Sequence, residues 1–264
     1  MATYVVGDIH GCFQTFEHLL RQINFRDHVD QIWFVGDLVN RGPDSLSILR
    51  WAAHRDALCV LGNHDLTCLA AYCSEAQVTD QGLQAVLKAP DVAELMTWFR
   101  RQPLMYWDEE VILVHAGFHP GWDFTEACRR ARALETHLRG SDWKTFLREV
   151  TDRSAVPSVL SESIGYLTRI RMCRADGTAA LTYKGRPEEA PDGFEPWYRR
   201  SQIVGGLRTV YFGHWAAHGH RVEPGLVALD DGCVWGGHLV AIRLEDGHVE
   251  RVKTHHGDMK KTPG

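Results

Sequence analysis

The fold is decided by the stretch Gly36-Asp37-Leu38-Val39-Asn40-Arg41-Gly42, which follows the apolar run Ile32-Trp33-Phe34-Val35. The apolar run predicts a buried strand, and Gly36 allows the chain to turn sharply where that strand ends. Asp37 would then project from the strand tip, with Arg41 in the loop beyond it. A carboxylate and a guanidinium this close together indicate a site for a metal ion and a phosphate group. Gly-Asp turns and Asp-Arg pairs are also common at surfaces, so the interpretation depends on further ligands elsewhere in the chain.

The composition is that of an ordinary globular protein, because 44% of the 264 residues are hydrophobic and 24% are charged. A chain of this length can bury a substantial core. No apolar run approaches the ~20 residues that a membrane-spanning helix needs. Residues 1–7 carry no basic segment before their apolar residues, so we expect no signal peptide and no membrane association.

Cysteine content and net charge narrow the function further. Seven cysteines, odd in number and without CxxC pairs, favour reduced thiols in a cytoplasmic protein over a disulfide framework. The formal net charge of -5 argues against a broad nucleic-acid-binding surface. An anionic ligand would therefore have to be held by a local cluster of positive side chains.

Three strand-loop-helix units open the chain. We predict strands at 3–7, 31–35 and 57–61, followed in turn by a helix at about 12–24, a helix from Pro43 and a mostly helical region at about 66–108. This repetition implies parallel strands joined by right-handed crossovers. In such a sheet, ligands bind beyond the carboxyl ends of the strands.

The rest of the chain is less regular, above all at 151–205. We expect strands at 111–114, 209–212, 226–230 and 238–245, with helical sequence at about 125–150. We also expect a capping box at Asp91 and Glu94, a two-residue hairpin turn at Asp246-Gly247 and a frayed tail from His255. The simplest account is an α/β architecture in a single domain, 1–264, with helical insertions at about 66–108 and 121–150.

Five of the predicted strands end in residues that can bind metal ions: Asp8 with His10, Asp37, Asn63 with His64, His115, and His214. Carboxylate, imidazole and amide oxygen without thiolate suit Mn, Fe, Co or Zn rather than a structural zinc. The ligands are too many for one ion and about enough for two. If one carboxylate bridges the ions, the natural choice is Asp37, with Asp8 and His10 on one side. Asn63, His115 and His214 would complete the other side.

Each of these residues also has a purely structural interpretation. Asp8 and His10 could lie in a strand-exit turn, Asn63 could cap the following helix, and His115 and His214 could be hydrogen-bonded at the edge of the core. Taken singly, most of them fit that interpretation better. All five groups in order, each at the end of an apolar strand, favour a binuclear metal site.

The motifs around these residues resemble those of a known family. GDIHG (7–11), GDLVNRG (36–42), GNHD (62–65), VHAG (114–117) and FGHW (212–215) are, in order, the signature of the calcineurin-like metallophosphoesterases. Within that superfamily the chain resembles the symmetrical bis(5'-nucleosyl)-tetraphosphatases, the diadenosine tetraphosphate hydrolases. The closer resemblance spans residues 1–237 and rests on MATYVVGDIHGCF, LVNRGPDSL, LGNHDLTCLA, WFRRQPLM, TRIRMC, PEEAP, FGHWA and ALDDGCVWGG.

The resemblance implies a four-layer αββα fold, in which two mixed β-sheets lie face to face with helices outside and a helical cap. It implies two divalent metal ions, Mn²⁺ first and Co²⁺, Fe²⁺ or Zn²⁺ as alternatives, bound by Asp8, His10, Asp37, Asn63, His115 and His214. It makes His64 the expected general acid, and Arg41 with Arg169 or Arg171 the expected phosphate clamps. In the implied reaction, hydroxide activated by the two metal ions attacks a phosphorus atom of the tetraphosphate, and two ADP are released.

The clamp roles also have a physical basis. Four phosphate groups need positive side chains, which an acidic chain must gather locally. The alternative interpretation of Thr168-Arg169-Ile170-Arg171 is a strand with two solvated arginines.

Asn40 marks a departure from the related protein Ser/Thr phosphatases, whose second motif reads GDxxDRG. An amide can hydrogen-bond the imidazole of His64 but does not stabilise its charged form as a carboxylate does. A weak acid is sufficient for a departing phosphate, whose second pKa is about 6, but less so for a serine alkoxide. Asn40 therefore favours a phosphoanhydride substrate over a phosphoprotein.

The expected substrates are dinucleoside polyphosphates, with nucleoside-tetraphosphate-capped RNA 5' ends as a further candidate, and no stable protein partner is indicated. Adenine could stack on Trp197, Tyr198, Trp215 or Trp235. We favour Trp197 and Tyr198, in a polar Pro-rich loop, because tryptophans at strand ends more often pack. The alternatives to this function are a protein Ser/Thr phosphatase, which Asn40 disfavours, and a non-catalytic metal-binding module, which the complete ligand set disfavours.

Overall fold

The computed structural model describes residues 1–74, 78–151 and 158–260. These residues form eight α-helices: α1 (Phe13–Gln22), α2 (Ser45–His54), α3 (Asn63–Tyr72), α4 (Gln81–Leu87), α5 (Val92–Phe99), α6 (Phe124–Arg139), α7 (Trp143–Thr151) and α8 (Val159–Arg169). Within the same ranges, no helix combines the length and the apolar character that crossing a membrane requires.

Most of the strands belong to two mixed sheets. The first contains β1 (Thr3–Val6), β2 (Gln31–Phe34), β3 (Leu58–Cys59), β11 (Asp230–Asp231), β12 (His238–Arg243) and β13 (Val249–Lys253). The second contains β4 (Met105–Trp107), β5 (Val111–Val114), β8 (Thr209–Phe212), β9 (Arg221–Glu223) and β10 (Leu226–Ala228). The parallel pairing predicted for the first three strands is confirmed, since β2 pairs in parallel with both β1 and β3. β12 runs antiparallel to β1 and extends the sheet on the other side.

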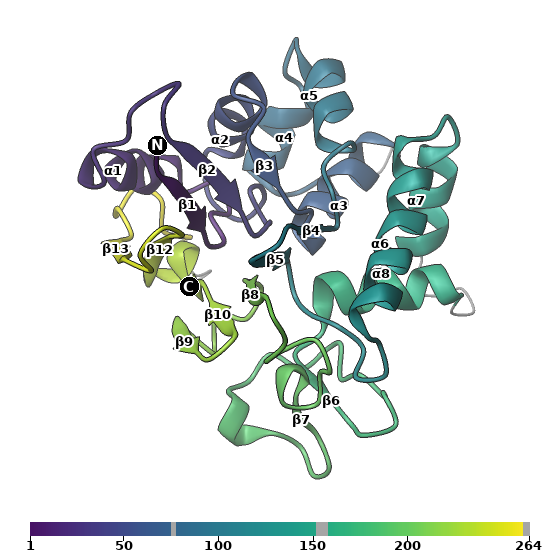
Figure 1. Cartoon of the computed structure of the whole chain (residues 1–264). Helices are drawn as coiled ribbons and strands as arrows, with labels where there is room; N and C mark the ends of the chain where they lie inside the picture. Colours follow the sequence, from purple (N-terminus) through teal and green to yellow (C-terminus); the bar gives the residue numbers. More distant parts are fainter. Residues whose placement is uncertain (75–77, 152–157, 261–264) are drawn as a thin grey trace.

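Successive side chains along the strands alternate between two hydrophobic clusters, which shows how the layers are stacked. One cluster combines Val5 and Val240 of the first sheet with Leu113 and Tyr211 of the second, so the sheets pack face to face. The other cluster takes the alternate residues, such as Ile112, together with the buried faces of the helices. α1 and α2 lie beside β1 and β2, while α6, α7 and α8 lie on the other side of β5 (Figure 1). The predicted mixed α/β sandwich is confirmed.

The segment at 151–205 is more regular than its sequence pattern indicates. It contains α8, whose first turn is capped by the Ser158 hydroxyl on the backbone N–H of Ser161. It also contains a small sheet of β6 (Met172–Cys173) and β7 (Glu195–Pro196). Ser161, Ser163 and Gly165 have low helix propensity, so residue propensity alone does not mark this segment as helical.

Three local expectations are wrong. Asp91 precedes α5, but its carboxylate makes no capping bond and instead pairs with Arg50 at 2.7 and 2.8 Å. The hairpin at Asp246-Gly247 forms with residues 244–248 between β12 and β13, a longer connection than two residues. The C-terminal segment is not frayed as far as Lys260, because Asp258 is fully buried and accepts hydrogen bonds from the backbone and hydroxyl of Thr15. Residues 261–264 lie outside the described part of the chain.

Candidate metal centre

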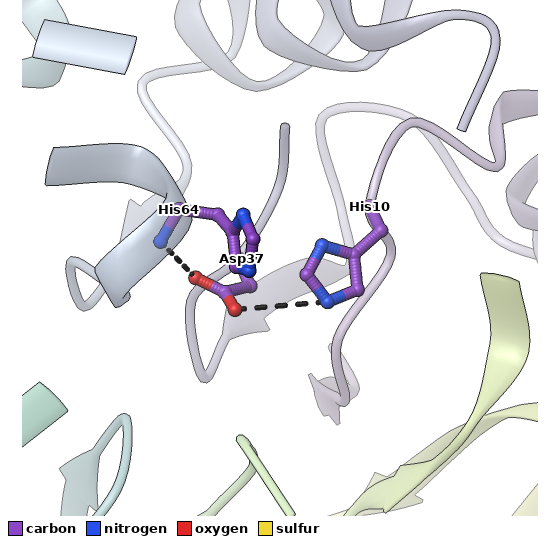
Figure 2. A group of neighbouring side chains, drawn as sticks. All are labelled: His10, Asp37 and His64. Carbon is purple, nitrogen blue, oxygen red and sulfur yellow. Dashed lines mark hydrogen bonds and ion pairs between the residues drawn. The ribbon is translucent and has the colours of Figure 1, made fainter. Parts of the chain in front are cut away.

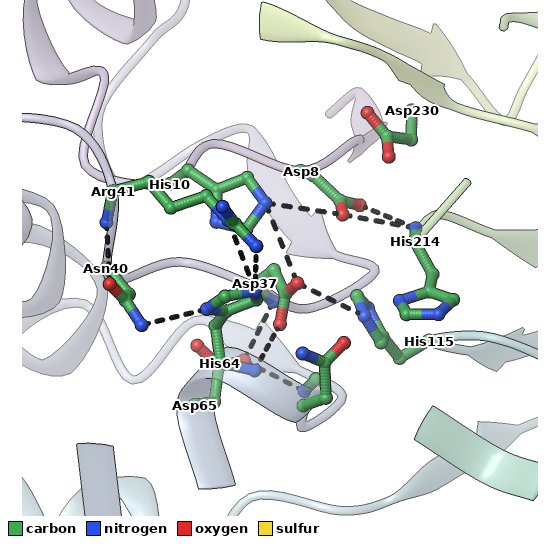
Figure 3. Close-up of polar contacts among 12 residues, drawn as sticks. Asp8, His10, Asp37, Asn40, Arg41, His64, Asp65, His115, His214 and Asp230 are labelled. Atoms are coloured by element: carbon green, nitrogen blue, oxygen red, sulfur yellow. Dashed lines mark hydrogen bonds and ion pairs between the residues drawn. The ribbon is translucent and has the colours of Figure 1, made fainter. Parts of the chain in front are cut away.

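The residues predicted to bind metal come together at one edge of the two sheets (Figure 3). They follow the carboxyl ends of five strands: Asp8 and His10 after β1, Asp37 after β2, Asn63 after β3, His115 after β5, and His214 after β8. Because the strands within each sheet that carry these residues are parallel, their carboxyl ends point to the same edge. The carboxylates and imidazoles of this set are at most 8% exposed.

Asp37 lies between two groups of side chains. Its Oδ2 atom is 3.6 Å from Nε2 of His10 and 3.3 Å from Nε2 of His115. The first group consists of His10, Asp37 and His64, which Figure 2 shows. The second group consists of Asp37, His115 and His214. Within each group the candidate ligand atoms lie within 4.8 Å of one another. Asp37 is common to both groups, which is the placement that a bridging carboxylate requires.

The three histidines are held with defined nitrogens pointing into the site. Backbone carbonyl groups face Nδ1 of His10 (Val39, 3.4 Å), Nδ1 of His115 (Val35, 2.8 Å) and Nε2 of His214 (Arg169, 3.1 Å). A carbonyl oxygen only accepts, so those nitrogens carry the protons. The opposite nitrogens therefore present lone pairs to the site, as metal-ligating histidines do.

Asn63 lies with its side-chain amide against His214. It is the first residue of α3, and Gly62 is the capping residue, so Asn63 does not act as the helix cap. Its amide oxygen faces Nδ1 of His214 and the carbonyl oxygen of Thr168; turned over, the amide nitrogen would donate to those atoms at 2.9 and 3.2 Å. Asn63 therefore lies next to the nitrogen of His214 that points into the site, where its amide oxygen could act as a metal ligand.

The site contains three buried carboxylates, those of Asp8, Asp37 and Asp230 (Figure 3). Burial, followed by the charges of Asp230 and Asp37, raises the pKa of Asp8 well above its usual range. Burial also acts to raise the pKa of Asp37, but the neighbouring histidines, led by His115, hold it well below its usual range. Burying several neighbouring carboxylates lowers the stability of the fold unless cations compensate their charge. The oxygen and nitrogen donors of this site are ligands that divalent metal ions accept.

The loops that carry these ligands have a strained backbone. The described residues include eight non-glycine residues with φ between 47° and 79°, and five of them belong to the predicted site: His10, Asp37, Asn40, Arg41 and His214. Each left-handed conformation of this kind costs about 1–3 kcal/mol and persists only where the surroundings fix it. The concentration of strain at one edge of the sheets indicates a preorganised functional site.

Two glycines allow the loops to approach the carboxylates. A Cβ atom on Gly62 would lie 2.1 Å from Oδ1 of Asp37, and one on Gly213 would lie 1.9 Å from Oδ1 of Asp8. Only glycine fits at both positions, since real Cβ atoms do not approach that closely.

Asp65 is a buried residue that the sequence analysis did not assign to the site. Its carboxylate accepts hydrogen bonds from the backbone N–H groups of Asp37, Leu38 and Gly62 at 2.8–2.9 Å. Burial and the charge of Asp37 raise the pKa of Asp65 to about 7, although its backbone hydrogen bonds act in the opposite direction. Asp65 thereby fixes the loop of Asp37 against the loop of Asn63. Asp65 lies in the GNHD motif, but its role depends on backbone N–H groups and could not be predicted from the residue types.

Asp230 was also missed, although it follows an apolar strand in the same way as the predicted ligands. Its side chain is 6% exposed and lines the cleft beside Asp8. Burial raises the pKa of Asp230 to about 6. It contributes negative charge to the side of the site where Asp8 lies.

His64 lies at the mouth of the site between Asn40 and Arg41. The Asn40 amide nitrogen is 2.8 Å from Nδ1 of His64, and the Arg41 guanidinium donates to Nε2 at 3.1–3.2 Å. The His64 backbone N–H donates to Oδ1 of Asp37 at 2.8 Å, which places the ring next to the Asp37 carboxylate. Burial lowers the pKa of His64 to about 3, since it outweighs the charge of Asp37, and the positive charge of Arg41 adds to the lowering. The imidazole is therefore neutral in this arrangement.

A cleft of about 690 Å³ opens over these residues. Its lining includes the predicted phosphate clamps Arg41, Arg169 and Arg171, together with Lys184. Arg171 is anchored by donating to the carbonyl groups of Tyr183 and His214, so the alternative of a solvated arginine does not hold for it. Burial lowers the pKa of Arg171, yet a guanidinium stays charged. The cleft thus combines metal-binding groups with four cationic side chains.

The expectation that Trp197 and Tyr198 stack on adenine is wrong. Trp197 is fully buried against Phe118 and Phe212, and Tyr198 is 5% exposed with its hydroxyl 2.9 Å from Nε2 of His218. Their Pro-rich loop folds into β7 and a 3-10 turn, which directs both rings into the core. Neither ring lines the cleft.

Comparison with known proteins agrees with this geometry. Residues 1–218 match the calcineurin-like phosphoesterase family. The chain is 44% identical to the symmetrical bis(5'-nucleosyl)-tetraphosphatase of Cellvibrio japonicus, covering 94% of this chain and 97% of that protein. It is 41% identical to the protein of the same name from Nitrosospira multiformis, covering 94% of each.

Solved structures show the same fold. A crystal structure of a candidate diadenosine tetraphosphatase superimposes with a TM-score of 0.68 at 27% identity, covering 97% of this chain and 95% of that one. A yeast protein serine/threonine phosphatase gives a TM-score of 0.56 at 14% identity, covering 100% and 81%, which is a likeness of fold alone. The chain belongs to the calcineurin-like phosphoesterases and, within them, to the family of the symmetrical bis(5'-nucleosyl)-tetraphosphatases.

Proposed function

We propose that this protein hydrolyses diadenosine 5',5'''-P1,P4-tetraphosphate and related dinucleoside polyphosphates symmetrically, releasing two ADP. The observation that carries the proposal is the cleft, in which Asp37 lies between His10 and the pair His115 and His214, and which four cationic side chains also line. A polyphosphate bears several negative charges in a row, which such a cleft can compensate along its length.

The residues present fit two divalent metal ions. Asp8 and His10 would hold one ion, Asn63, His115 and His214 the other, and Asp37 both; we favour Mn²⁺, with Co²⁺, Fe²⁺ or Zn²⁺ as alternatives. When bound, such ions supply Lewis acidity and lower the pKa of a bound water. The side chain of Asp65 and three backbone carbonyl groups would keep the ligands aligned for the two ions; the carbonyl groups are those of Val35, Val39 and Arg169.

Positive side chains of the cleft bind and orient the polyphosphate. Arg41, Arg169 and Arg171 all line the cleft, Arg41 from the loop that also carries Asp37 and Arg169 from the end of α8. A guanidinium offers paired N–H donors that match phosphate oxygens. These arginines would hold the phosphorus atom in line for attack and stabilise the charge that develops on its oxygens.

His64 would give a proton to the leaving phosphate once substrate is bound. Arg41 donates to Nε2, so the neutral imidazole carries its proton on Nδ1, and burial together with the adjacent guanidinium disfavours the imidazolium. A phosphate that takes over the donors of Arg41 would free Nε2 and set a negative charge beside the ring. Both changes raise the pKa of His64.

Asn40 favours a phosphoanhydride over a phosphoprotein. Its amide stands at the position where a carboxylate would stabilise a charged His64. The ADP that leaves a tetraphosphate needs little protonation, whereas an alkoxide needs a strong acid. The protein Ser/Thr phosphatase alternative is therefore the weaker one. Capped RNA with a 5' tetraphosphate presents the same chemical group and is a second candidate substrate.

A cytoplasmic location is part of the proposal. All seven cysteines lie among the described residues, each is a buried free thiol, and free thiols are typical of a reducing compartment. We also propose that residues 1–264 form one domain, with α3–α5 and α6–α7 as helical insertions; their hydrophobic side chains share one cluster with the sheets.

The test is product analysis. The purified protein is incubated with Mn²⁺ or Co²⁺ and diadenosine tetraphosphate, and the nucleotides are separated. ADP as the sole nucleotide product supports the proposal, whereas ATP with AMP would mean asymmetric attack. No turnover of the dinucleotide, with phosphate released from a phosphopeptide, would favour the phosphatase alternative.

A further inference from the structure

One aromatic side chain is exposed in the cleft. Trp235 is 54% exposed, whereas Trp215, which also lines the cleft, is 2% exposed and donates its indole N–H to the carbonyl group of Gly185. Among the described residues, Trp235 is the only aromatic side chain in the set of exposed large hydrophobic ones. An indole that is half in water has an energetic cost, which a ligand with a flat ring would relieve.

The backbone holds Trp235 firmly despite this exposure. The ring is at the end of a short 3-10 turn between Gly232 and Gly236, and both glycines adopt left-handed φ angles of 69° and 87°. Val234 is buried next to it and its carbonyl group accepts from the backbone N–H of Lys260. A ring held in this way loses little freedom when a base stacks on it.

Two cations adjoin the ring. The Cζ atom of Arg41 is 5.0 Å from the ring centroid of Trp235, and Nζ of Lys260 is 5.9 Å from it. The same guanidinium donates to Nε2 of His64. Arg41 therefore connects the exposed ring to the side chain that would protonate the leaving phosphate.

We propose that Trp235 is the stacking platform for a nucleoside base, and that this base belongs to the ADP that leaves. This inference rests on the proposed function. A base on Trp235 would place its phosphates at Arg41, with the departing oxygen on the side of His64. The base is recognised by its flat π-face, so the binding contribution comes from stacking and from the cations beside the ring.

The experiment compares Trp235→Ala and Trp235→Phe with the unchanged protein on two substrates, diadenosine tetraphosphate and inorganic tetraphosphate, in the presence of Mn²⁺. Loss of a base-aromatic stack is expected to raise KM for the dinucleotide about 5- to 100-fold in the alanine variant. The phenylalanine variant is expected to recover most of that loss. KM and kcat for inorganic tetraphosphate, which has no base, should change less than about threefold. Trp98→Ala, a tryptophan outside the cleft, is the matched control.

Calorimetric titration with ADP and with pyrophosphate separates this inference from the proposed function. Weaker binding of ADP but not of pyrophosphate to Trp235→Ala supports the platform, even in a protein that does not cleave the dinucleotide. An alanine variant with unchanged KM and unchanged ADP affinity overturns it. Equal losses on the base-free and base-containing substrates overturn it too, because they would mean that Trp235 only supports the fold.

Discussion

Asp65 offers the sharpest test of how the site is held together, because it orders the loops without being a predicted metal ligand. Its Oδ2 accepts from the backbone N–H groups of Asp37 and Gly62, and its Oδ1 accepts from that of Leu38. The substitution Asp65→Asn keeps the shape of the side chain. If the asparagine oxygen takes the position of Oδ2, the bonds from Asp37 and Gly62 are kept. The NH₂ group then takes the position of Oδ1 and faces the backbone N–H of Leu38, which has no acceptor.

The cost follows from this geometry. A hydrogen bond to a charged acceptor contributes about 1.5–3 kcal/mol, and a buried N–H without a partner costs about 1–3 kcal/mol. We therefore expect Asp65→Asn to lower the free energy of unfolding by about 2–4 kcal/mol. A domain of this size loses roughly 2–4 °C in Tm per kcal/mol, so Tm should fall by about 4–16 °C. Loss of such a supporting contact should also weaken metal binding about 10- to 100-fold.

The measurement is urea unfolding and metal titration at pH 8, where Asp65 is ionised because its pKa is about 7. The matched control is Asp123→Asn. Asp123 caps α6 at the surface, and asparagine is an equally good cap, so stability should change by less than about 0.5 kcal/mol. Unchanged stability and unchanged metal affinity in Asp65→Asn would refute the assigned role of its three hydrogen bonds.

Three further outcomes are expected. Asn40→Asp should raise the rate of hydrolysis of alkyl phosphomonoesters more than that of phosphoanhydrides, because a carboxylate stabilises the charged form of His64. Equal effects on both substrate types in steady-state assays would contradict this prediction. Glu126→Gln should be less stable than the unchanged protein at pH 7 but not at low pH. Hydrogen bonds from Arg129 and Arg130 lower the pKa of Glu126 to about 2. Its contribution to the free energy of unfolding is therefore present above the unfolded pKa of about 4.3 and is lost as the pH falls toward 2. A difference in urea midpoint between the two proteins that does not shrink on acidification would contradict this prediction. Asp258→Ala should lower the free energy of unfolding by about 2–5 kcal/mol, because it removes two buried hydrogen bonds from Thr15. A change below about 0.5 kcal/mol, measured by chemical denaturation, would show that the C-terminal segment does not anchor α1.

The candidate ligands could be found by sequence analysis because each of them follows an apolar strand within one or two residues of a glycine. Within the first sheet the parallel order of β1, β2 and β3 determines that the ends carrying Asp8, Asp37 and Asn63 lie at one edge. The contact of Asp37 with His115 depends on how the second sheet packs against the first, which strand order alone does not determine. The residues that hold the ligands were harder to find. Asp65 acts through backbone N–H groups, which carry no signature in the sequence.

The direction in which an aromatic side chain points could not be predicted. Trp197 lies in a proline-containing segment and Trp235 in a glycine-rich one, yet one ring is buried and the other is exposed. The difference comes from tertiary contacts: Trp197 packs between Phe118 and Phe212, while the turn at Trp235 is fixed by its flanking glycines. Such contacts are decided by segments distant in the chain, as is the burial of Asp258 against α1.

The central claim is that two divalent ions share Asp37, and metal stoichiometry tests it most directly. Elemental analysis of Mn²⁺-loaded protein should give two ions per chain. His10→Ala and His214→Ala should each retain one ion, and Asp37→Ala should retain fewer than one, with all variants folded by circular dichroism. Two ions retained by Asp37→Ala, or a single ion in the unchanged protein, would contradict the account.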